Sequence, residues 1–275
     1  MKAYCVALTH NGLVRANNED SILCDGWVRN RPMSGPVSFV SGSDPTAPRV
    51  FALADGLGGH SSGEVASQLA LSMICAEIAE SAEISEVFLT EMLQRVHQVL
   101  FEISQHVPSY KGMGTTVAGL VICSDGRPFV FNVGDSRVYR REDRFLQLLT
   151  NDDRPDFAGY GEDAHDSVSK SSLLQCLGGV TEFTRIAPHV LRLDVSTRPE
   201  TFLLCSDGVS DMISQDEIEG SSSDSHETTV ETIFDRVRKA GAKDNVSLMI
   251  VEIFPRSQLQ VIPAVPTSGT VLTPG

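Results

Sequence analysis

The order of predicted elements indicates an α+β fold, in which antiparallel β-sheets carry helices on their outer faces. Strand-like segments come first, two adjacent helices follow, and more strands precede a last helix and a last strand. Parallel α/β folds alternate strands with helices along the chain, and this order does not. The length of 275 residues and the hydrophobic fraction of 41% allow one full core. We therefore expect one domain built from layers of sheet and helix.

Four strands are predicted in the first 54 residues. They are apolar segments bounded by Gly, Pro, Ser and Asp, which favour turns. Their expected ranges are 3–9, 20–24, 37–41 and 50–54.

Two amphipathic helices are predicted next, and helices so close together are expected to pack as a pair. The first begins at Ser61, where Glu64 completes a capping box. Its apolar face is expected to hold Val65, Leu69, Met73 and Ile74. The second spans about 84–107 and ends before a proline. Its apolar residues are Val87, Leu93, Val96, Leu100 and Ile103.

The second half of the chain returns to strands. An antiparallel meander is predicted over 115–123, 128–134, 137–141 and 145–149. Residues 151–172 are polar and acidic without periodicity, which predicts a surface flap. The remaining elements are strands at 185–194, 201–205 and 246–253 and a helix at 226–240. Residues 255–275 are rich in Pro, Ser and Thr and predict a disordered tail after a folded domain of residues 1–254.

Composition restricts the class of partner and the compartment. The net charge of −14 argues against nucleic acid or an anionic membrane surface, because both repel an acidic protein at long range. The six cysteines contain no CxxC pair, which is typical of reduced thiols. The first residues lack the long apolar segment typical of a signal peptide, and no stretch approaches transmembrane length, so we expect neither feature. We expect a cytoplasmic protein.

Carboxylates at strand ends are the main indication of function. Three apolar strands end in an aspartate, at Asp55, Asp135 and Asp207, and Asp244 precedes the last strand. An ionised carboxylate at the end of a buried strand is costly unless a partner compensates it. Each one alone would more often be a turn cap. Four in similar settings suggest a shared site.

A pair of hard cations would explain these carboxylates. Mg²⁺ and Mn²⁺ prefer carboxylate, carbonyl and water ligands. We therefore assign Asp55, Asp207 and Asp244 as metal ligands. Glu19 and Asp20 add acids beside Arg15, whose planar guanidinium suits a phosphate.

Each neighbouring residue also has an ordinary structural interpretation. Arg15 alone would more often be a surface ion-pair partner, and Asp20 could cap the following strand. His60 alone would more often be a loop histidine than a proton donor.

Six motifs follow one another between residue 12 and about residue 253. They are Gly12-Leu-Val-Arg15-Ala-Asn-Asn-Glu19-Asp20, Ala54-Asp55-Gly56-Leu-Gly-Gly-His60, Gly112-Met-Gly-Thr115-Thr116, Asn132-Val-Gly-Asp135-Ser-Arg137, Ser206-Asp207-Gly208-Val-Ser-Asp211 and Lys243-Asp244-Asn245-Val. In this order the set resembles the metal-dependent protein phosphatases of the PPM family, also called type 2C, in their compact bacterial form. One motif alone would be weak evidence, whereas the ordered set is specific.

The resemblance implies a fold and a metal site. The fold would be a four-layer αββα sandwich of two antiparallel β-sheets flanked by helix pairs. Asp55 would bridge two Mn²⁺ or Mg²⁺ ions together with the carbonyl of Gly56. Asp207 and Asp244 would complete the coordination of one ion, and Glu19 would act through water. Asp135, with Asp207, matches the site of a third, weaker ion.

The resemblance also implies an activity. A water held by the metals would attack the phosphorus of phosphoserine or phosphothreonine in a single in-line step. Arg15 would hold the substrate phosphate, and His60 or a metal-bound water would protonate the leaving group. The expected partners are phosphorylated proteins, including a serine/threonine kinase or its targets, and the protein is expected to be a monomer.

The chain also departs from the family pattern. Leu57 follows Asp-Gly where many eukaryotic members have a histidine, and His10 stands where relatives often have an aspartate. Asp153 stands where many have a histidine, so the 151–172 flap is atypical and substrate preference is open. The segment 25–49 exceeds the family minimum and is expected to form a mobile hairpin.

Three alternatives belong to other classes. Gly59-His-Ser61-Ser-Gly63 fits the nucleophile elbow of a serine hydrolase, with His189 or His226 as the base, but residues 55–58 separate it from the strand. A cysteine-based tyrosine phosphatase needs an arginine six positions after a cysteine, and none of the six cysteines has one. A non-catalytic phosphoprotein-binding module gains no support, because the carboxylates are all present.

Overall fold

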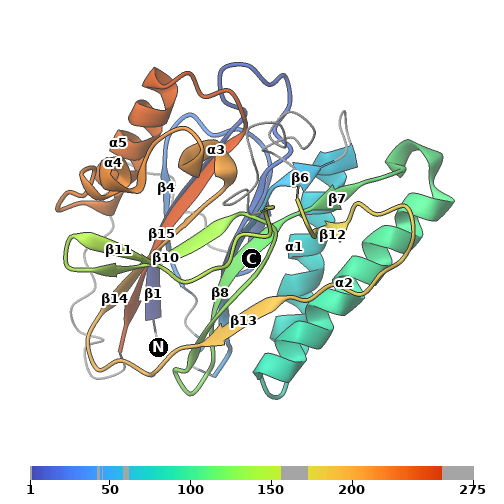
Figure 1. The fold of residues 1–275 in the computed structure, drawn as a ribbon. Coiled ribbons are helices and arrows are strands. Elements are labelled where there is room, and N and C mark those ends of the chain that lie inside the picture. Colours follow the sequence, from blue (N-terminus) through green and yellow to red (C-terminus); the bar gives the residue numbers. More distant parts are fainter. Residues whose placement is uncertain (1, 42–43, 45, 58–61, 156–172, 256–275) are drawn as a thin grey trace.

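Two six-stranded antiparallel sheets form the centre of the computed structural model, which describes residues 2–41, 44, 46–57, 62–155 and 173–255 (Figure 1). The β1 sheet contains, in spatial order, β11 (Phe145–Leu148), β10 (Arg137–Glu142), β14 (Glu200–Cys205), β15 (Val246–Phe254), β1 (Lys2–His10) and β4 (Val37–Val40). The β8 sheet contains β13 (His189–Arg192), β9 (Pro128–Val133), β8 (Val117–Ile122), β5 (Arg49–Ala54), β2 (Ser21–Cys24) and β3 (Trp27–Arg29). A third, small sheet contains β12 (Leu177–Gly178), β7 (Gly114–Thr115) and β6 (Gly56–Leu57).

Helices cover the outer faces of the two large sheets. The pair α1 (Ser62–Glu80) and α2 (Glu86–His106) packs on the β8 sheet, and the short η1 (Pro108–Tyr110) follows it. On the β1 sheet lie α3 (Asp207–Ser210), α4 (Gln215–Glu219) and α5 (His226–Lys239). The four-layer sandwich of the prediction is present, with one hydrophobic cluster in each of its three interlayer spaces.

Alternation along the central strands explains the layers. In β1, Tyr4, Val6 and Leu8 face the helix side, while Cys5 and Ala7 face the other sheet. A strand buried on both faces needs apolar residues at every position, because successive side chains point to opposite faces. Such strands are therefore confined to the interior of the sandwich.

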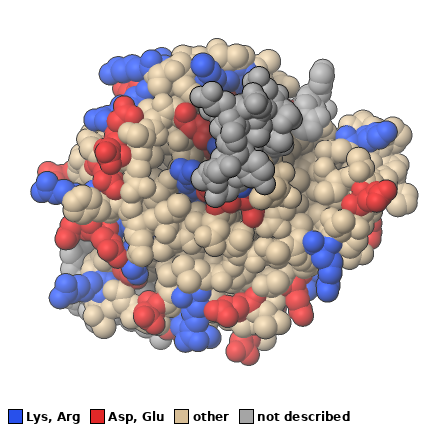
Figure 2. Space-filling view, viewed as in Figure 1, with Lys and Arg blue, Asp and Glu red and all other residues tan. Residues whose placement is uncertain are grey.

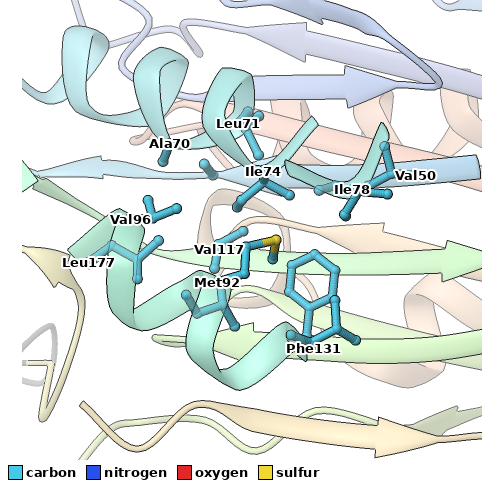
Figure 3. Close-up of a cluster of buried hydrophobic side chains, with 14 of the residues drawn as sticks. Val50, Ala70, Leu71, Ile74, Ile78, Met92, Val96, Val117, Phe131 and Leu177 are labelled. Atoms are coloured by element: carbon cyan, nitrogen blue, oxygen red, sulfur yellow. The ribbon is translucent and has the colours of Figure 1, made fainter. Parts of the chain in front are cut away.

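The helical faces differ partly from the predicted ones. Figure 3 shows Leu71, Ile74 and Ile78 of α1 lying over the β8 sheet, close to Met92 and Val96 of α2. The predicted α1 residues Val65, Leu69 and Met73 are only partly buried. The residues that follow each of them, Ala66, Ala70 and Ile74, are the ones buried against the sheet.

The start of α2 also corrects the prediction. Val87 is 66% exposed, because it lies on the side of α2 opposite the buried residues Leu89 and Val96. The other predicted residues Leu93, Val96 and Leu100 are buried, with Ile103 partly so.

The predicted meander is wrong, because its strands divide between the two sheets. β8 pairs with β9 in one sheet, and β10 pairs with β11 in the other. The chain crosses from sheet to sheet at Gly134, whose φ of +100° suits glycine. A Cβ at Gly134 would also lie 2.7 Å from side-chain atoms of Thr116. The crossing places Asp135 at the end of both sheets, whereas a meander would have left it in a single sheet.

The hairpin expected within 25–49 is also wrong. β3 pairs with β2 in the β8 sheet, and β4 pairs with β1 in the β1 sheet. The segment therefore connects the two layers.

Some expectations fall outside the described ranges. They concern the tail from residue 256 and the flap residues 156–172. A single domain of residues 1–254 stays a prediction. Among the helices that the structure describes, none is long and apolar enough to cross a membrane.

Figure 2 shows Lys and Arg side chains interspersed with Asp and Glu on one face of the molecule. Charges of both signs in alternation keep the field of that face weak at long range. The concentrated charge lies in the cleft described next.

Candidate active site

Seven of the eight residues assigned from the sequence line one cleft of about 480 Å³. They are Arg15, Glu19, Asp55, Gly56, Asp135, Asp207 and Asp244. The eighth, His60, lies outside the described residues. Strand ends and loops of both large sheets contribute to the cleft, so the site depends on the sandwich being assembled.

Asp55 lies between β5 and β6, where its backbone is fixed from two sides. Its carbonyl accepts hydrogen bonds from the Thr115 hydroxyl and the Thr116 amide, both at 2.8 Å. Its amide donates to Thr116 Oγ1 at 3.1 Å. Thr116 Oγ1 also lies 2.8 Å from Ser136 Oγ. The two threonines thus connect Asp55 with the crossing that carries Asp135.

Glycine is required where three chain segments meet beside Asp55. A Cβ on Gly56 would lie 2.2 Å from the carbonyl oxygen of Gly63 and 2.6 Å from that of Glu19. A Cβ on Gly63 would lie 2.6 Å from Glu19 Oε2. Real Cβ atoms do not approach so closely, so both glycines allow the segment of Glu19 to lie against the start of α1.

The segments of Asp207 and Asp244 also touch. Asp207 is the first residue of α3, and a Cβ on the following Gly208 would lie 1.8 Å from the carbonyl oxygen of Asn245. Asn245 accepts a hydrogen bond from the Glu19 amide and donates one to the carbonyl of Asn17, both at 2.8 Å. Asn245 therefore connects the segment of Asp244 to the loop of Arg15 and Glu19.

Burial and mutual repulsion perturb the carboxyl groups. Asp20 is fully buried, and burial raises its pKa to about 7. Burial, and then the charge of Asp135, raises the pKa of Asp207 to about 6. Burial, followed by the charges of Asp20 and Asp207, raises the pKa of Asp55 well above its ordinary value. Such a group of carboxyls is typical of a site that receives positive charge.

The donor set fits hard divalent cations. It consists of oxygen atoms alone, as Mg²⁺ and Mn²⁺ prefer. Asp20 Oδ2 accepts a hydrogen bond from Ser206 Oγ at 2.9 Å, while its Oδ1 is buried without a hydrogen-bond partner among the described residues. A cation nearby would compensate this orphaned oxygen.

The carboxylates do not form a ready-made cage. Among the described residues, no group of three or more His, Cys, Asp or Glu side chains is arranged to hold a metal ion. Two arginines lie among the acids instead. Arg15 donates to Asp244 at 2.8 Å. Arg154 donates to Asp207 at 3.1 Å and also contacts Asp135 and Asp211.

Sequence reasoning gave no role to Arg154 or Asp211 and considered Asp20 only as a strand cap or an additional acid. An arginine after two aspartates is too common a pattern to indicate a site. The full burial of Asp20 depends on packing between segments distant in sequence. Asp211 stands in the Ser206–Asp211 motif, which was the available signal.

Asp153, the departure noted in the sequence, has a structural role. Its Oδ2 accepts from the Gly134 amide, and its Oδ1 lies 2.8 Å from His189 Nε2. His226 Nε2 lies 3.0 Å from Glu252. Both histidines considered for a serine triad therefore have carboxylate partners of their own, and Ser61 lies outside the described residues.

Comparison with known proteins decides the family. A family model described as Protein phosphatase 2C matches residues 39–250. The chain belongs to the protein phosphatase 2C family. This is the family, also called PPM or type 2C, that the six motifs resemble, so the resemblance is confirmed.

Curated relatives carry related names. The serine/threonine phosphatase stp of Listeria monocytogenes serotype 4b is 28% identical over 257 residues, covering 89% of this chain and 93% of the relative. The serine/threonine protein phosphatase PstP of Mycobacterium tuberculosis is 28% identical over 278 residues, or 96% of this chain. The type 2C chain described here spans about half of that longer relative, namely 48%.

Solved structures confirm the fold class. The crystal structure of Mycobacterium tuberculosis PstP/Ppp matches with a TM-score of 0.72 at 25% identity, covering 93% of this chain and all of that one. A PstP catalytic domain in complex with two manganese ions has a TM-score of 0.69 at 24% identity and covers the same shares. This likeness identifies the sandwich as a type 2C phosphatase fold.

Proposed function

We propose that this chain is a metal-dependent protein serine/threonine phosphatase. The observation that carries the proposal is the cleft that gathers Arg15, Glu19 and the carboxylates of three strand ends. A serine hydrolase or a cysteine phosphatase would not need acids from both sheets around one cavity. The names of the relatives support the same activity.

Asp55, Asp207 and Asp244, with the carbonyl of Gly56, would hold two Mn²⁺ or Mg²⁺ ions, and Glu19 would act through water. When bound, the ions supply positive charge and an activated water for hydrolysis of the phosphoester. Thr115 and Thr116 fix the carbonyl of Asp55, so its carboxylate enters the cleft from a rigid position.

Arg15 would bind the phosphate group of the substrate. Its side chain is 57% exposed at the rim of the cleft, and its guanidinium can offer two parallel donors to a phosphate. The leaving group would receive its proton from His60 or from a water at the site.

We further propose that the substrates are phosphorylated proteins that include a serine/threonine kinase or its targets. The protein would act as a cytoplasmic monomer. The reduced cysteines support this location, since all six are free and four are buried.

The test is turnover of para-nitrophenyl phosphate and a phosphothreonine peptide. Activity is expected with Mn²⁺, and it is expected to disappear with EDTA and in Asp207→Asn. The exposed Asp194→Asn is the matched control and should retain activity. Equal turnover with EDTA, and in Asp207→Asn, would refute the metal mechanism.

A further inference from the structure

Arg154 contacts three carboxylates at one side of the cleft. Its Nη2 lies 3.1 Å from Asp207 Oδ2, and its Nη1 and Nη2 lie 2.9 and 3.0 Å from the two oxygens of Asp211. Its Nε donates to the carboxylate of Asp135. One guanidinium therefore supplies the positive charge for all three acids, two of which come from the Ser206–Asp211 motif.

This cluster is not an ordinary surface ion pair. The side chain of Asp135 is 6% exposed, and those of Arg154 and Asp207 are 20% and 21% exposed, while Asp211 at the outer edge is 45% exposed. Charges in such a position are weakly screened by solvent, so removal of the cation leaves acids that repel one another.

The backbone before Arg154 holds it in place. The amide of Asp153 donates to the carbonyl of Gly134 at 3.0 Å, and Asp153 Oδ2 accepts from the Gly134 amide at 2.8 Å. Arg137 Nη2 donates to Asp152 Oδ2 at 2.6 Å. Residues 152–154 are thus attached to the crossing that carries Asp135, and the guanidinium starts from a fixed point.

The acids that Arg154 contacts include the pair expected to bind a third, weaker ion, Asp135 and Asp207. A divalent cation that bound Asp135 and Asp207 would be repelled by the guanidinium of Arg154 and would have to displace it from these carboxylates. We propose that Arg154 is a built-in cation that takes the place of the third metal ion and limits this enzyme to two divalent ions. This inference rests on the proposed metal site but does not require turnover.

The test counts ions. Mn²⁺ bound per chain is measured by equilibrium dialysis with elemental analysis, and the affinities are measured by calorimetry. The wild-type protein is expected to saturate at two ions. Arg154→Gln removes the charge and should bind a third ion, which the double variant Arg154→Gln/Asp135→Asn should lose again. Arg95→Gln, which removes an exposed arginine paired with Glu77 on the outer helices, is the control and should stay at two.

Two further measurements make the test independent of the folding of one variant. Arg154→Lys keeps a cation and should remain at two ions. In EDTA, Arg154→Gln should melt several degrees below wild type, and Mn²⁺ should raise its melting temperature more than that of wild type.

Three ions in the wild-type protein, or two ions at unchanged affinity in a folded Arg154→Gln, would overturn the inference and leave the proposed function intact. A wild-type chain that binds no Mn²⁺ would overturn both.

Discussion

Arg15 Nη2 lies 2.8 Å from Asp244 Oδ2, so the arginine assigned to the phosphate is paired with a carboxylate assigned to a metal. The two side chains are 57% and 41% exposed. Such an exposed pair contributes about 0–1 kcal/mol, which ligands can readily exceed. Metal at Asp244 would compete for the carboxylate and leave Arg15 available to the phosphate.

Arg15→Ala should impair catalysis without unfolding the protein. Loss of charge-assisted hydrogen bonds to phosphate is worth about 1.5–3 kcal/mol, or roughly a 10- to 150-fold fall in kcat/KM. The melting temperature should be nearly unchanged. Steady-state kinetics on a phosphopeptide check this, with Arg95→Ala as the control. If Arg15→Ala had the same kcat/KM as wild type, Arg15 would not be the residue that binds the substrate phosphate.

Asp20→Asn should stabilise the metal-free protein and weaken Mn²⁺ binding. Burial raises the pKa of Asp20 from 3.8 to about 7, so wild type loses stability as pH rises through this range. The variant has no carboxyl group to ionise and so avoids that loss. In EDTA its free energy of unfolding should exceed that of wild type by an amount that grows between pH 4 and pH 8 to a few kcal/mol, as expected on the order of a pKa difference this large.

Urea unfolding in EDTA at several pH values measures the effect of Asp20→Asn, and calorimetry measures its Mn²⁺ affinity. If Asp20→Asn were more stable than wild type by the same amount at pH 4 and pH 8, ionisation of the buried Asp20 would not be the cause. Asp194→Asn provides an exposed control.

Gly208→Ala should damage the site through the backbone. The new Cβ would lie 1.8 Å from the carbonyl oxygen of Asn245, so the segment of Asp244 must move. Overpacking of this kind costs about 1–3 kcal/mol. Gly35→Ala is the matched control, because a Cβ there meets nothing within 4 Å. Chemical denaturation and Mn²⁺ titration should separate the two variants; equal behaviour would disprove the close contact.

Glu227, which does not line the cleft, should make the stability of the folded protein sensitive to acid. Burial opposes its charge, but hydrogen bonds from Ser38, Tyr4 and Ser225 lower its pKa to about 2. The stability it contributes is therefore present above pH 4.5, the ordinary value, and is lost as pH falls toward 2.

Glu227→Gln should lower stability at pH 7 by about 1–2 kcal/mol, since it weakens bonds that join β1, β4 and α5. It should also flatten the acid part of the stability profile. Urea unfolding between pH 2 and pH 7 measures both effects. Glu231→Gln, exposed on the same helix, should behave as wild type.

Local patterns predicted most elements because burial repeats with the period of each element. The strands at β1, β5, β14 and β15 and the helix at α5 were found within a few residues. The short elements β6, β12, α3 and α4 were missed, since segments of so few residues carry no clear period, whereas the four-residue strands β2, β4 and β11 were found from their apolar residues and flanking turns. Val87 was wrongly placed on the apolar face, since the nine positions between Val87 and Val96 amount to about 2.5 turns and put the two residues on opposite sides of the helix.

The sequence by itself determined the family and seven of the residues that line the cleft, because the motifs combine strand ends, glycines and acids in a fixed order. Only the tertiary structure decided which charges meet. Arg15 and Asp244 are 229 positions apart, and Arg154 and Asp207 are 53 apart. Hydrophobic periodicity reports whether a residue is buried and not which distant residue lies beside it. Arg15 and Asp244 meet because β1 and β15 are antiparallel neighbours that place His10 opposite Val246. Arg154 meets Asp207 because Asp153 is attached to Gly134, where the chain crosses between the sheets.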